Sequence, residues 1–193
     1  MSIILIIFAP NLKHIHMDDF RSHWWGFAAL PKGFTQPYHG EDNPMTLICQ
    51  FALGEGAVWV FADLDYWFGD LEAESGSLGE WDKAFYKVLY APKVDEVFEH
   101  EIRYEDGTSA VPEEVKAKGE WLEANGSHVL GRATTWTDEI AQEFPGYEVL
   151  VQLEEDDEIG LRFYDCGSLF FLVKKEDLEA RHFEDVKCVL YSY

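Results

Sequence analysis

Residues Thr46–Ala62 of this chain, TLICQFALGEGAVWVFA, predict a β-hairpin around which the rest of the fold is organised. The first strand is an apolar run that carries one polar residue, Gln50. The second strand, Ala57–Ala62, is rich in β-branched and aromatic side chains, which favour strands. The strands are joined at Gly54-Glu55-Gly56, a short glycine-containing loop of the kind that connects antiparallel strands.

The pattern of this hairpin returns in the second half of the chain, where Gln152 lies in the apolar stretch Glu148–Leu153. Four landmarks recur in one order: Ser22-His23-Trp24-Trp25-Gly26 with Ser127-His128-Val129-Leu130-Gly131, Gln50 with Gln152, the strand after Gly56 with the strand after Gly167, and Val88-Leu89-Tyr90 with Val189-Leu190-Tyr191. We interpret them as an internal duplication, with halves at about 22–92 and 127–193 joined by a helical linker at about 93–126. The alternative is that β-rich chains produce matches such as Val-Leu-Tyr by chance.

The sequence predicts an α+β fold, predominantly antiparallel β-sheet with a few short helices, in which two pseudo-repeated halves pack as one body. A chain of 193 residues is most simply a single domain, 1–193. Helices are expected at Pro112–Asn125 and, with Thr135 as its capping residue, at Trp136–Phe144. Further strands are expected at Ile3–Phe8, Phe85–Tyr90, Val94–Tyr104, Ile159–Tyr164 and Val186–Tyr191, and one or two helical turns at Lys175–Arg181.

The charge of the chain is strongly negative, because it has 37 acidic and only 15 basic residues, which give a formal net charge of −22. Such a field repels phosphate backbones and anionic membrane surfaces, so we expect neither nucleic acid nor membrane as a partner. It attracts a basic protein and raises the rate of association with one. The alternative is that the acidic residues mainly keep an aromatic-rich chain soluble.

Three cysteines, Cys49, Cys166 and Cys188, lie in or beside apolar segments and show no CxxC spacing. An odd number of such residues is typical of reduced thiols in a cytosolic protein. The apolar stretch Ile3–Phe8 has no basic residue before it, and it is far shorter than a membrane helix, which needs about 20 residues. We therefore expect a cytoplasmic protein.

The packing and turn residues resemble those of the YwqG-like proteins, a bacterial family of unknown function, from about Ser22 to the C-terminus. The residues that carry the resemblance are Gly26, Leu30-Pro31, Pro37, Pro44, Leu47–Gln50, Gly56–Phe61, Lys87–Tyr90, Gly131, Leu150–Gln152, Gly167–Phe171, Asp177-Leu178 and Phe183. In this chain Trp25-Gly26 stands where the family usually has Gly-Gly, and Gln36-Pro37 where it has Trp-Pro. The resemblance implies a mixed fold dominated by antiparallel sheet, and it implies no reaction and no catalytic residue.

Two histidines, His14 and His16, form the nearest approach to a metal motif, since alternate residues of a strand share a face. Asp18, Asp19 or His23 would have to supply a third ligand, and exposed or hydrogen-bonded imidazoles are the simpler interpretation. The chain has no GxSxG, HExxH, P-loop or GxGxxG pattern, which favours a protein without catalysis or cofactor.

The loop 63–83 mixes carboxylates with tryptophans and is interrupted by glycines, and long loops of this kind are either functional or mobile. Asp63, Asp65 and Asp70 lie among aromatic residues there, a setting that raises the pKa of a carboxyl group for acid catalysis or holds a sugar on Trp67 or Trp81. Solvated acidic side chains are the alternative account of this loop.

Gln50 and Gln152 are each polar within an apolar strand, and a buried amide must be hydrogen-bonded. A pseudo-twofold relation between the halves would bring the two amides together, in which case they, with Trp59, line a site. The alternative, which we favour, is that each amide binds strand backbone.

Two functions compete on these observations. The first is a non-enzymatic, immunity-like interaction protein that captures a basic partner through its negative charge and aromatic loop. The second is a small-ligand-binding domain or enzyme with a pocket between the two halves. A weaker third is a DNA mimic, which needs carboxylates spaced along one elongated face.

Overall fold

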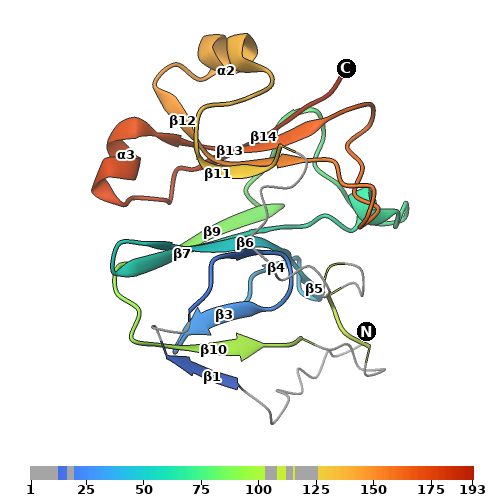
Figure 1. The fold of residues 1–193 in the computed structure, drawn as a ribbon. Helices are drawn as coiled ribbons and strands as arrows, with labels where there is room; N and C mark the ends of the chain where they lie inside the picture. The colour runs from blue at the N-terminus through green and yellow to red at the C-terminus, as the bar shows by residue number, and fades with distance from the viewer. Residues whose placement is uncertain (1–12, 17–19, 103–107, 112–114, 116–125) are drawn as a thin grey trace. The chain divides into compact units, whose positions relative to one another are not determined.

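The computed structural model describes residues 13–16, 20–102, 108–111, 115 and 126–193 (Figure 1), with the backbone alone at 13–16 and 100. Over these residues the fold is mostly antiparallel β-sheet with two α-helices, so the predicted fold class is confirmed. The chain divides into two compact units, residues 1–63 with 89–122 and residues 64–88 with 123–193. No helix in the described part of the chain is long and apolar enough to span a membrane.

The first unit contains a four-stranded sheet with the order β2-β6-β7-β9 and a three-stranded sheet with the order β1-β10-β3. The strands of the larger sheet are β2 (His23–Trp24), β6 (Thr46–Leu53), β7 (Gly56–Ala62) and β9 (Tyr86–Ala91). Those of the smaller sheet are β1 (Lys13–His16), β3 (Ala28–Pro31) and β10 (Glu96–His100), and a two-stranded hairpin is formed by β4 (Tyr38–His39) and β5 (Asn43–Pro44). The predicted hairpin at 46–62 is therefore present as β6 and β7.

The core of the first unit forms around Trp59, which is fully buried. Its indole N–H donates to the carbonyl of Ala29 at 2.9 Å, and the edge of its ring system meets Phe20. Leu30 and Val97, from the paired strands β3 and β10, pack in the same cluster. The apolar side chains of β3, β7 and β10 thus share one core.

Gln50 of β6 lies opposite His23 of β2 on one side and Trp59 of β7 on the other. The register of β6 against β7 shifts between Leu47 and Cys49, which marks a β-bulge just before the glutamine. The turn after β2 passes through a left-handed residue, Trp25, with φ 61°.

The second unit is built on a five-stranded sheet with the order β11-β12-β13-β14-β8. Its strands are β8 (Gly79–Glu80), β11 (His128–Gly131), β12 (Tyr147–Glu154), β13 (Ser168–Lys174) and β14 (Lys187–Tyr191). The helix α2 (Thr137–Glu143) lies over one face of this sheet (Figure 1), where Ile140 packs with Phe170 and Val189. The helix α3 (Lys175–Ala180) follows β13, and the 3-10 turn η2 (Tyr66–Phe68) belongs to the loop before β8.

Gln152 of β12 lies opposite His128 of β11 on one side and Phe170 of β13 on the other. The register of β12 against β13 shifts between Val149 and Val151, again just before the glutamine. Leu130, two residues after His128 and within β11, is also left-handed, with φ 51°.

One serine in each unit binds the backbone beyond the glutamine. The Ser22 hydroxyl accepts a hydrogen bond from the N–H of Ala52 at 3.1 Å, and the Ser127 hydroxyl accepts one from the N–H of Glu154 at 2.9 Å. The serine precedes the histidine in both places, and the bonded amide lies two residues after the glutamine. The two sheets therefore repeat a register, a bulge, a left-handed residue two positions after the histidine, and a side-chain bond.

The strand predicted at Ile159–Tyr164 is wrong, because this segment consists of turns apart from one bridge between Asp156 and Leu161. The alternating apolar side chains there are buried, but the backbone N–H groups find other acceptors. The N–H of Arg162 donates to the Trp67 carbonyl, and that of Phe163 donates to the Glu155 carboxylate. The alternation of apolar residues thus reflects the burial of their side chains, although the segment forms no strand.

The helix predicted at Trp136–Phe144 begins at Thr137, but the predicted capping by Thr135 is wrong. Trp136 holds the N-cap position in a left-handed conformation, and no side chain caps the helix. The strand expected at Ile3–Phe8 lies outside the described residues, as does the helix expected at Pro112–Asn125 apart from Val115, which is buried.

Candidate functional site

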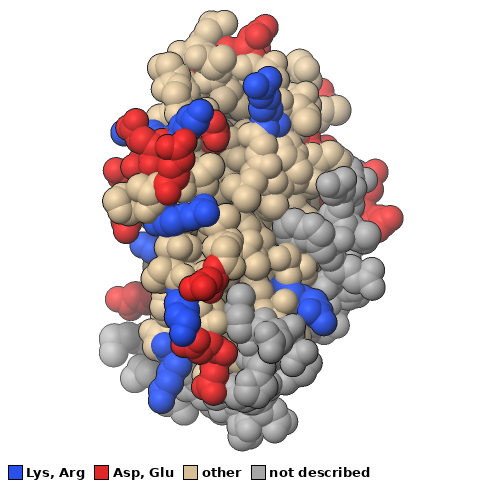
Figure 2. All heavy atoms as spheres, turned by 60° about the vertical axis from the view of Figure 1, so that its left-hand side comes forward, with Lys and Arg blue, Asp and Glu red and all other residues tan. Residues whose placement is uncertain are grey.

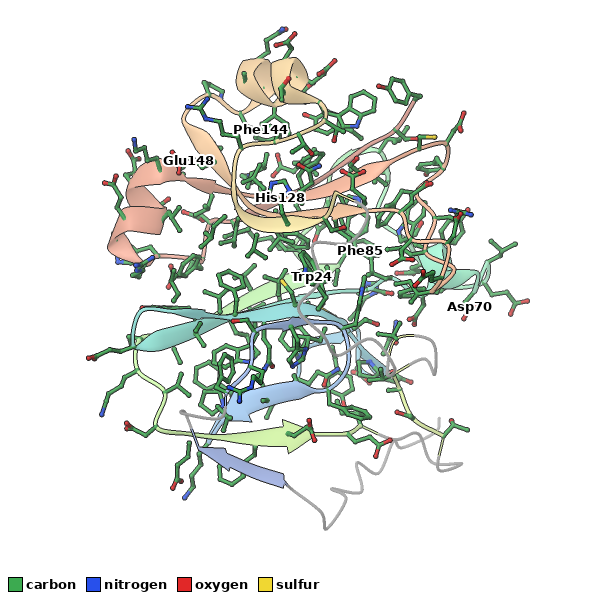
Figure 3. All side chains as sticks on the ribbon, viewed as in Figure 1. Trp24, Asp70, Phe85, His128, Phe144 and Glu148 are labelled. Atoms are coloured by element: carbon green, nitrogen blue, oxygen red, sulfur yellow. The ribbon has the colours of Figure 1, made fainter. Side chains whose placement is uncertain are left out.

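Three large apolar side chains, Leu71, Leu78 and Tyr164, are exposed on two loops of the second unit, with exposed fractions of 76%, 53% and 54%. Exposed carboxylates flank them on the same two loops: Asp70, Glu72, Glu74, Asp157, Glu158 and Asp165. We call these nine residues the acidic-apolar surface. Figure 3 shows Asp70 projecting outward from its loop.

The first of the two loops is shaped by the turn η2, in which the N–H groups of Trp67 and Phe68 both donate to the Leu64 carbonyl. Gly69 ends this turn in a left-handed conformation with φ 103°, which a glycine adopts without strain. Asp65 contributes a backbone hydrogen bond to the same turn, because its carbonyl accepts from the N–H of Asp70 at 3.0 Å. The turn therefore leaves Asp70 and Leu71 at the surface.

The two loops are joined over a buried aromatic cluster centred on Trp67. The Trp67 ring stacks on Trp81 with centroids 6.4 Å apart, and it contacts Phe163 at 5.5 Å and Tyr164 at 4.9 Å. The Trp67 carbonyl accepts a hydrogen bond from the N–H of Arg162 at 3.0 Å. Tyr164 thus rests on a core that fixes both loops to each other.

The predicted role of Trp67 and Trp81 as a surface for stacking a sugar does not fit their burial, since they are exposed by only 4% and 3%. The Trp81 indole N–H donates to the Ser77 carbonyl at 2.7 Å, and Gly76 packs directly against the Trp81 ring. A Cβ added at Gly76 would lie 2.1 Å from that ring. The Trp67 indole N–H is buried without a hydrogen-bond partner.

The loop 163–167 holds two non-glycine residues in the left-handed region, Tyr164 with φ 60° and Cys166 with φ 54°. Bulky residues adopt this conformation at a cost, and such residues cluster at functional sites. The Glu155 carboxylate accepts from the N–H groups of Phe163 at 2.8 Å and Gly167 at 3.3 Å, which holds the loop in place. The exposed Tyr164 is therefore presented by a loop that is both strained and anchored.

The basic side chains of these two segments, Lys83 and Arg162, are each engaged by carboxylates. Lys83 lies 3.4 Å from Asp185, and Arg162 pairs with Asp157. A partner approaching the acidic-apolar surface therefore meets a net negative charge. The face of the molecule turned forward in Figure 2 differs, because basic and acidic side chains are interspersed on it.

Asp63 belongs to the first unit and is buried, with 2% of its area exposed. Its carboxylate accepts hydrogen bonds from His39 Nδ1 at 2.6 Å and from Asn43 Nδ2 at 3.2 Å. His39 and Asn43 belong to β4 and β5, so Asp63 ties this hairpin to the end of β7. The predicted binding role of Asp63 thus gives way to a structural contact.

The two glutamine amides bind backbone and side chains of their own units. Gln50 Oε1 accepts from the N–H of Ala29 at 2.9 Å, and its Nε2 donates to the Arg21 carbonyl at 3.0 Å. Gln152 Oε1 accepts from the N–H of Thr134 at 3.0 Å, and its Nε2 donates to Glu154 Oε1 at 2.5 Å. These contacts agree with the structural role favoured from the sequence.

The metal site and the thiols considered from the sequence can be followed where the structure describes their side chains. His14 and His16 lie on β1, which pairs with β10, and their side chains are outside the described part. Among the side chains that the structure does describe, no three His, Cys, Asp or Glu residues are grouped to hold a metal ion. Burial raises the pKa of the Cys49 and Cys188 thiols, whereas Cys166 is exposed.

Sequence reasoning missed Leu71, Leu78 and Tyr164, although it selected the loop 63–83 that holds two of them. The available signal was an apolar residue isolated among acidic residues and glycines, as in Gly69-Asp70-Leu71-Glu72. A side chain in that setting has few neighbours in the chain with which to be buried, so exposure was the simplest expectation.

One family model, described as a domain of unknown function (DUF1963), matches residues 22–191. This range includes both glutamine-bearing sheets and both loops of the acidic-apolar surface. A search of curated proteins finds no match for the chain.

Proposed function

The chain belongs to the family described as a domain of unknown function (DUF1963), a description that names no reaction, and we propose that it is a non-enzymatic interaction protein that captures a basic protein partner. The acidic-apolar surface is the contact region in this proposal. The observation that carries it is the exposure of Leu71, Leu78 and Tyr164 on two anchored loops that also carry exposed carboxylates.

The apolar part of the surface supports a protein partner. Large exposed apolar side chains that sit together on a monomer commonly mark an interaction site. Tyrosine is enriched at such sites because it offers a large contact area with one polar end. Tyr164 contacts Trp67 of the buried cluster, so it is held in place before a partner arrives and loses little freedom on binding.

The charged part of the surface supports a basic partner. Asp70, Glu72 and Glu74 surround Leu71 on one loop, and the neighbouring loop adds Asp157 and Asp165. Carboxylates placed around an apolar centre steer a cationic partner toward it and then contribute charge-assisted hydrogen bonds at the rim. The formal charge of −22 over the chain adds a long-range attraction of the same sign.

The proposal extends to the setting of the protein. A YwqG-like, bacterial and cytoplasmic protein with an immunity-like role, binding a cationic toxin, fits the resemblance and the charge. The three cysteines support the reducing compartment, since all of them are free and two are buried.

We also propose that both sheets descend from one β-unit that was copied within the chain. The support is the recurrence of four details around Gln50 and Gln152: the opposing histidine, the preceding bulge, the left-handed residue two positions after the histidine, and the serine that binds the backbone. Chance matches of sequence do not explain why these details recur together. The loop 63–83 is not among the features that recur in the two halves. We interpret it as an insertion that carries the function.

The test is capture of partners from the native lysate on the full chain, compared with two charge-matched triple variants. Asp70→Asn, Glu72→Gln and Glu74→Gln together remove charge from the surface, whereas Glu176→Gln, Glu179→Gln and Glu184→Gln remove the same charge elsewhere in the unit. We expect a basic protein to be retained by the wild type and the second variant, and lost from the first.

The apolar contribution is tested in the same way with leucines. Leu71→Ser and Leu78→Ser together should abolish capture, whereas Leu130→Ser, at a leucine with 38% exposure outside the surface, should leave it intact. Capture that survives both surface variants, or the absence of any captured basic protein, contradicts the proposal.

A further inference from the structure

Three residues of the second unit form a row across neighbouring strands: Glu154 of β12 lies opposite Ser168 of β13, and Ser168 lies opposite Tyr191 of β14. Residues directly opposite each other in an antiparallel sheet project from the same face. The next row on that face contains Phe170 and Val189, which pack beneath α2. The row of Glu154 therefore lies at the end of the face that α2 covers.

The Glu154 carboxylate is held by donors on both oxygens. Its Oε2 accepts from the Ser168 hydroxyl at 2.7 Å, and its Oε1 accepts from Gln152 Nε2 at 2.5 Å and from the Thr135 hydroxyl at 3.4 Å. Gln152 and Ser168 are buried, so these donors have little freedom to move. Each carboxylate oxygen accepts two hydrogen bonds, which leaves Oε2 with capacity beyond the bond from Ser168.

An aromatic stack stands beside this carboxylate. The Trp136 ring is stacked on Tyr191, with centroids 5.4 Å apart and an interplanar angle of 15°, and Tyr193 lies 4.6 Å from Trp136. Trp136 adjoins Thr135, which binds Glu154, and it is held in the left-handed region with φ 53°. A tryptophan in that conformation is strained, and strained residues of this kind cluster at functional sites.

The corresponding place in the first unit lacks this chemistry. Two residues after Gln50 stands Ala52, and its partner across the hairpin is Ala57, where the second unit has Glu154 and Ser168. The sheet of the first unit therefore forms with two alanine side chains in the corresponding row. The carboxylate and the hydroxyl are therefore additions that the sheet itself does not require.

We propose that Glu154 and the aromatic group of Trp136, Tyr191 and Tyr193 form a binding site for a guanidinium group, that of an arginine side chain on the basic partner. This inference rests on the proposed function and gives it a specific anchor. A guanidinium is planar, it stacks on aromatic faces, and it donates in its plane to a carboxylate. Glu154 offers the carboxylate, and Tyr193 beside Trp136 offers an aromatic ring that is 88% exposed. A second carboxylate, Glu143, accepts from the Tyr191 hydroxyl at 2.9 Å.

The site is connected by hydrogen bonds to the acidic-apolar surface. The N–H of Asp165 donates to the Ser192 hydroxyl at 3.1 Å, and that hydroxyl donates to the Asp165 carbonyl at 2.9 Å. Asp165 belongs to the surface, and Ser192 lies between Tyr191 and Tyr193 of the stack. The guanidinium site and the acidic-apolar surface thus belong to the same unit, so one partner can contact both.

The probe for this site is L-argininamide, titrated into the full chain while the indole N–H signal of Trp136 is followed by NMR. Trp136→Phe assigns that signal among the seven tryptophans. L-Citrullinamide, which has nearly the same shape without the charge, is the matched control. We expect a saturable shift with argininamide at a dissociation constant of roughly 1 mM, and at least about tenfold weaker binding of citrullinamide.

Two variants with the same change of charge complete the test. Glu154→Gln should weaken argininamide binding at least about tenfold, because the charge-assisted contact is lost. Glu148→Gln, near the other end of β12 (Figure 3), should leave binding unchanged. The comparison of the two ligands on wild-type protein stands even if Glu154→Gln does not fold.

Equal shifts from argininamide and citrullinamide, or equal binding by the two variants, overturn the guanidinium site. The proposed function fails separately, through the surface variants of Asp70, Glu72 and Glu74. Capture of a basic protein that is lost in those variants, with no effect of Glu154→Gln, overturns this inference and leaves the proposed function standing.

Discussion

Gln50 and Gln152 hold the same position in two sheets of matching strand order, each opposite a histidine on one neighbouring strand and an aromatic residue on the other. Each amide oxygen accepts from the backbone of the segment that follows the histidine strand. This relationship explains why one polar residue persists in each apolar strand, because it binds a chain segment that the sheet ladder does not reach.

The two glutamines should differ in their contribution to stability. Gln50→Ala leaves the buried N–H of Ala29 without an acceptor, which costs about 1–3 kcal/mol beyond the lost side chain. Gln152→Ala frees the N–H of Thr134, an exposed residue whose amide water can reach, so that penalty is smaller. Urea unfolding of both variants measures the difference, and a larger loss for Gln152→Ala contradicts this account.

Two glycines at the starts of the hairpin strands should not tolerate alanine. A Cβ at Gly56 would lie 2.2 Å from the Ala91 carbonyl oxygen, and one at Gly167 would lie 2.2 Å from the Phe163 carbonyl oxygen. Because backbone must move in both cases, we expect each substitution to cost about 3 kcal/mol or more, or to prevent folding.

Gly160 provides the control for these two glycines. It has a φ of +72° with open space around it, so Gly160→Ala costs only the strain of a left-handed alanine, about 1–2 kcal/mol. Thermal or urea unfolding ranks the three variants. Equal losses in all three would mean that the close backbone approach at Gly56 and Gly167 is not a constraint.

The stability of the protein should fall in mild acid through His23. Burial lowers the pKa of His23 below its ordinary value of 6.5, despite the hydrogen bond to the Trp25 carbonyl. The unfolded chain therefore binds a proton more readily as the pH falls through 6.5, and stability is lost from there down to the folded pKa. Above 6.5 this group contributes no pH dependence.

The measurement for His23 is urea unfolding between about pH 7.5 and about pH 5.5, where one proton contributes at most about 1.4 kcal/mol per pH unit. His23→Gln should unfold with a shallower dependence on pH than the wild type, since other groups titrate in both. Identical slopes for the two proteins would show that His23 does not titrate differently in the folded and unfolded states.

The two tryptophans under the acidic-apolar surface should respond differently to phenylalanine. Trp81→Phe removes a hydrogen bond to the Ser77 carbonyl, whereas Trp67→Phe removes a buried N–H that has no partner. Both substitutions leave a similar cavity, so Trp81→Phe should be more destabilising by about 1 kcal/mol. Equal free energies of unfolding would indicate that the Trp67 N–H has an acceptor in solution.

The sequence predicted much of the fold where local patterns decide it. The hairpin of β6 and β7, the strands around Gln152 and the final strand are all visible in the sequence as short apolar runs. The pairing of β10 with β1 and β3, and of β8 with β14, joins residues far apart in the chain. No local pattern specifies such pairs, because either edge of several strands could accept them.

The site was harder to predict, because exposure depends on the tertiary structure. Trp67 and Trp81 suggested a surface from the sequence, yet they form the buried support, and the exposed residues are Leu71, Leu78 and Tyr164. Ile159, Leu161 and Phe163 alternate as in a strand, but Glu155 and Trp67 take the backbone donors of that segment. In both cases, contacts made in the tertiary structure decide the outcome.

The most direct test of the proposed function is the dissociation constant of the captured basic protein, measured at ionic strengths of about 0.05 M and about 0.5 M. Screening should weaken binding by the wild type at least about tenfold between these conditions, and the Asp70, Glu72 and Glu74 triple variant should bind weakly at both. The Glu176, Glu179 and Glu184 triple variant should follow the wild type. Affinity that is independent of salt and equal in all three proteins would contradict an interaction through the acidic-apolar surface.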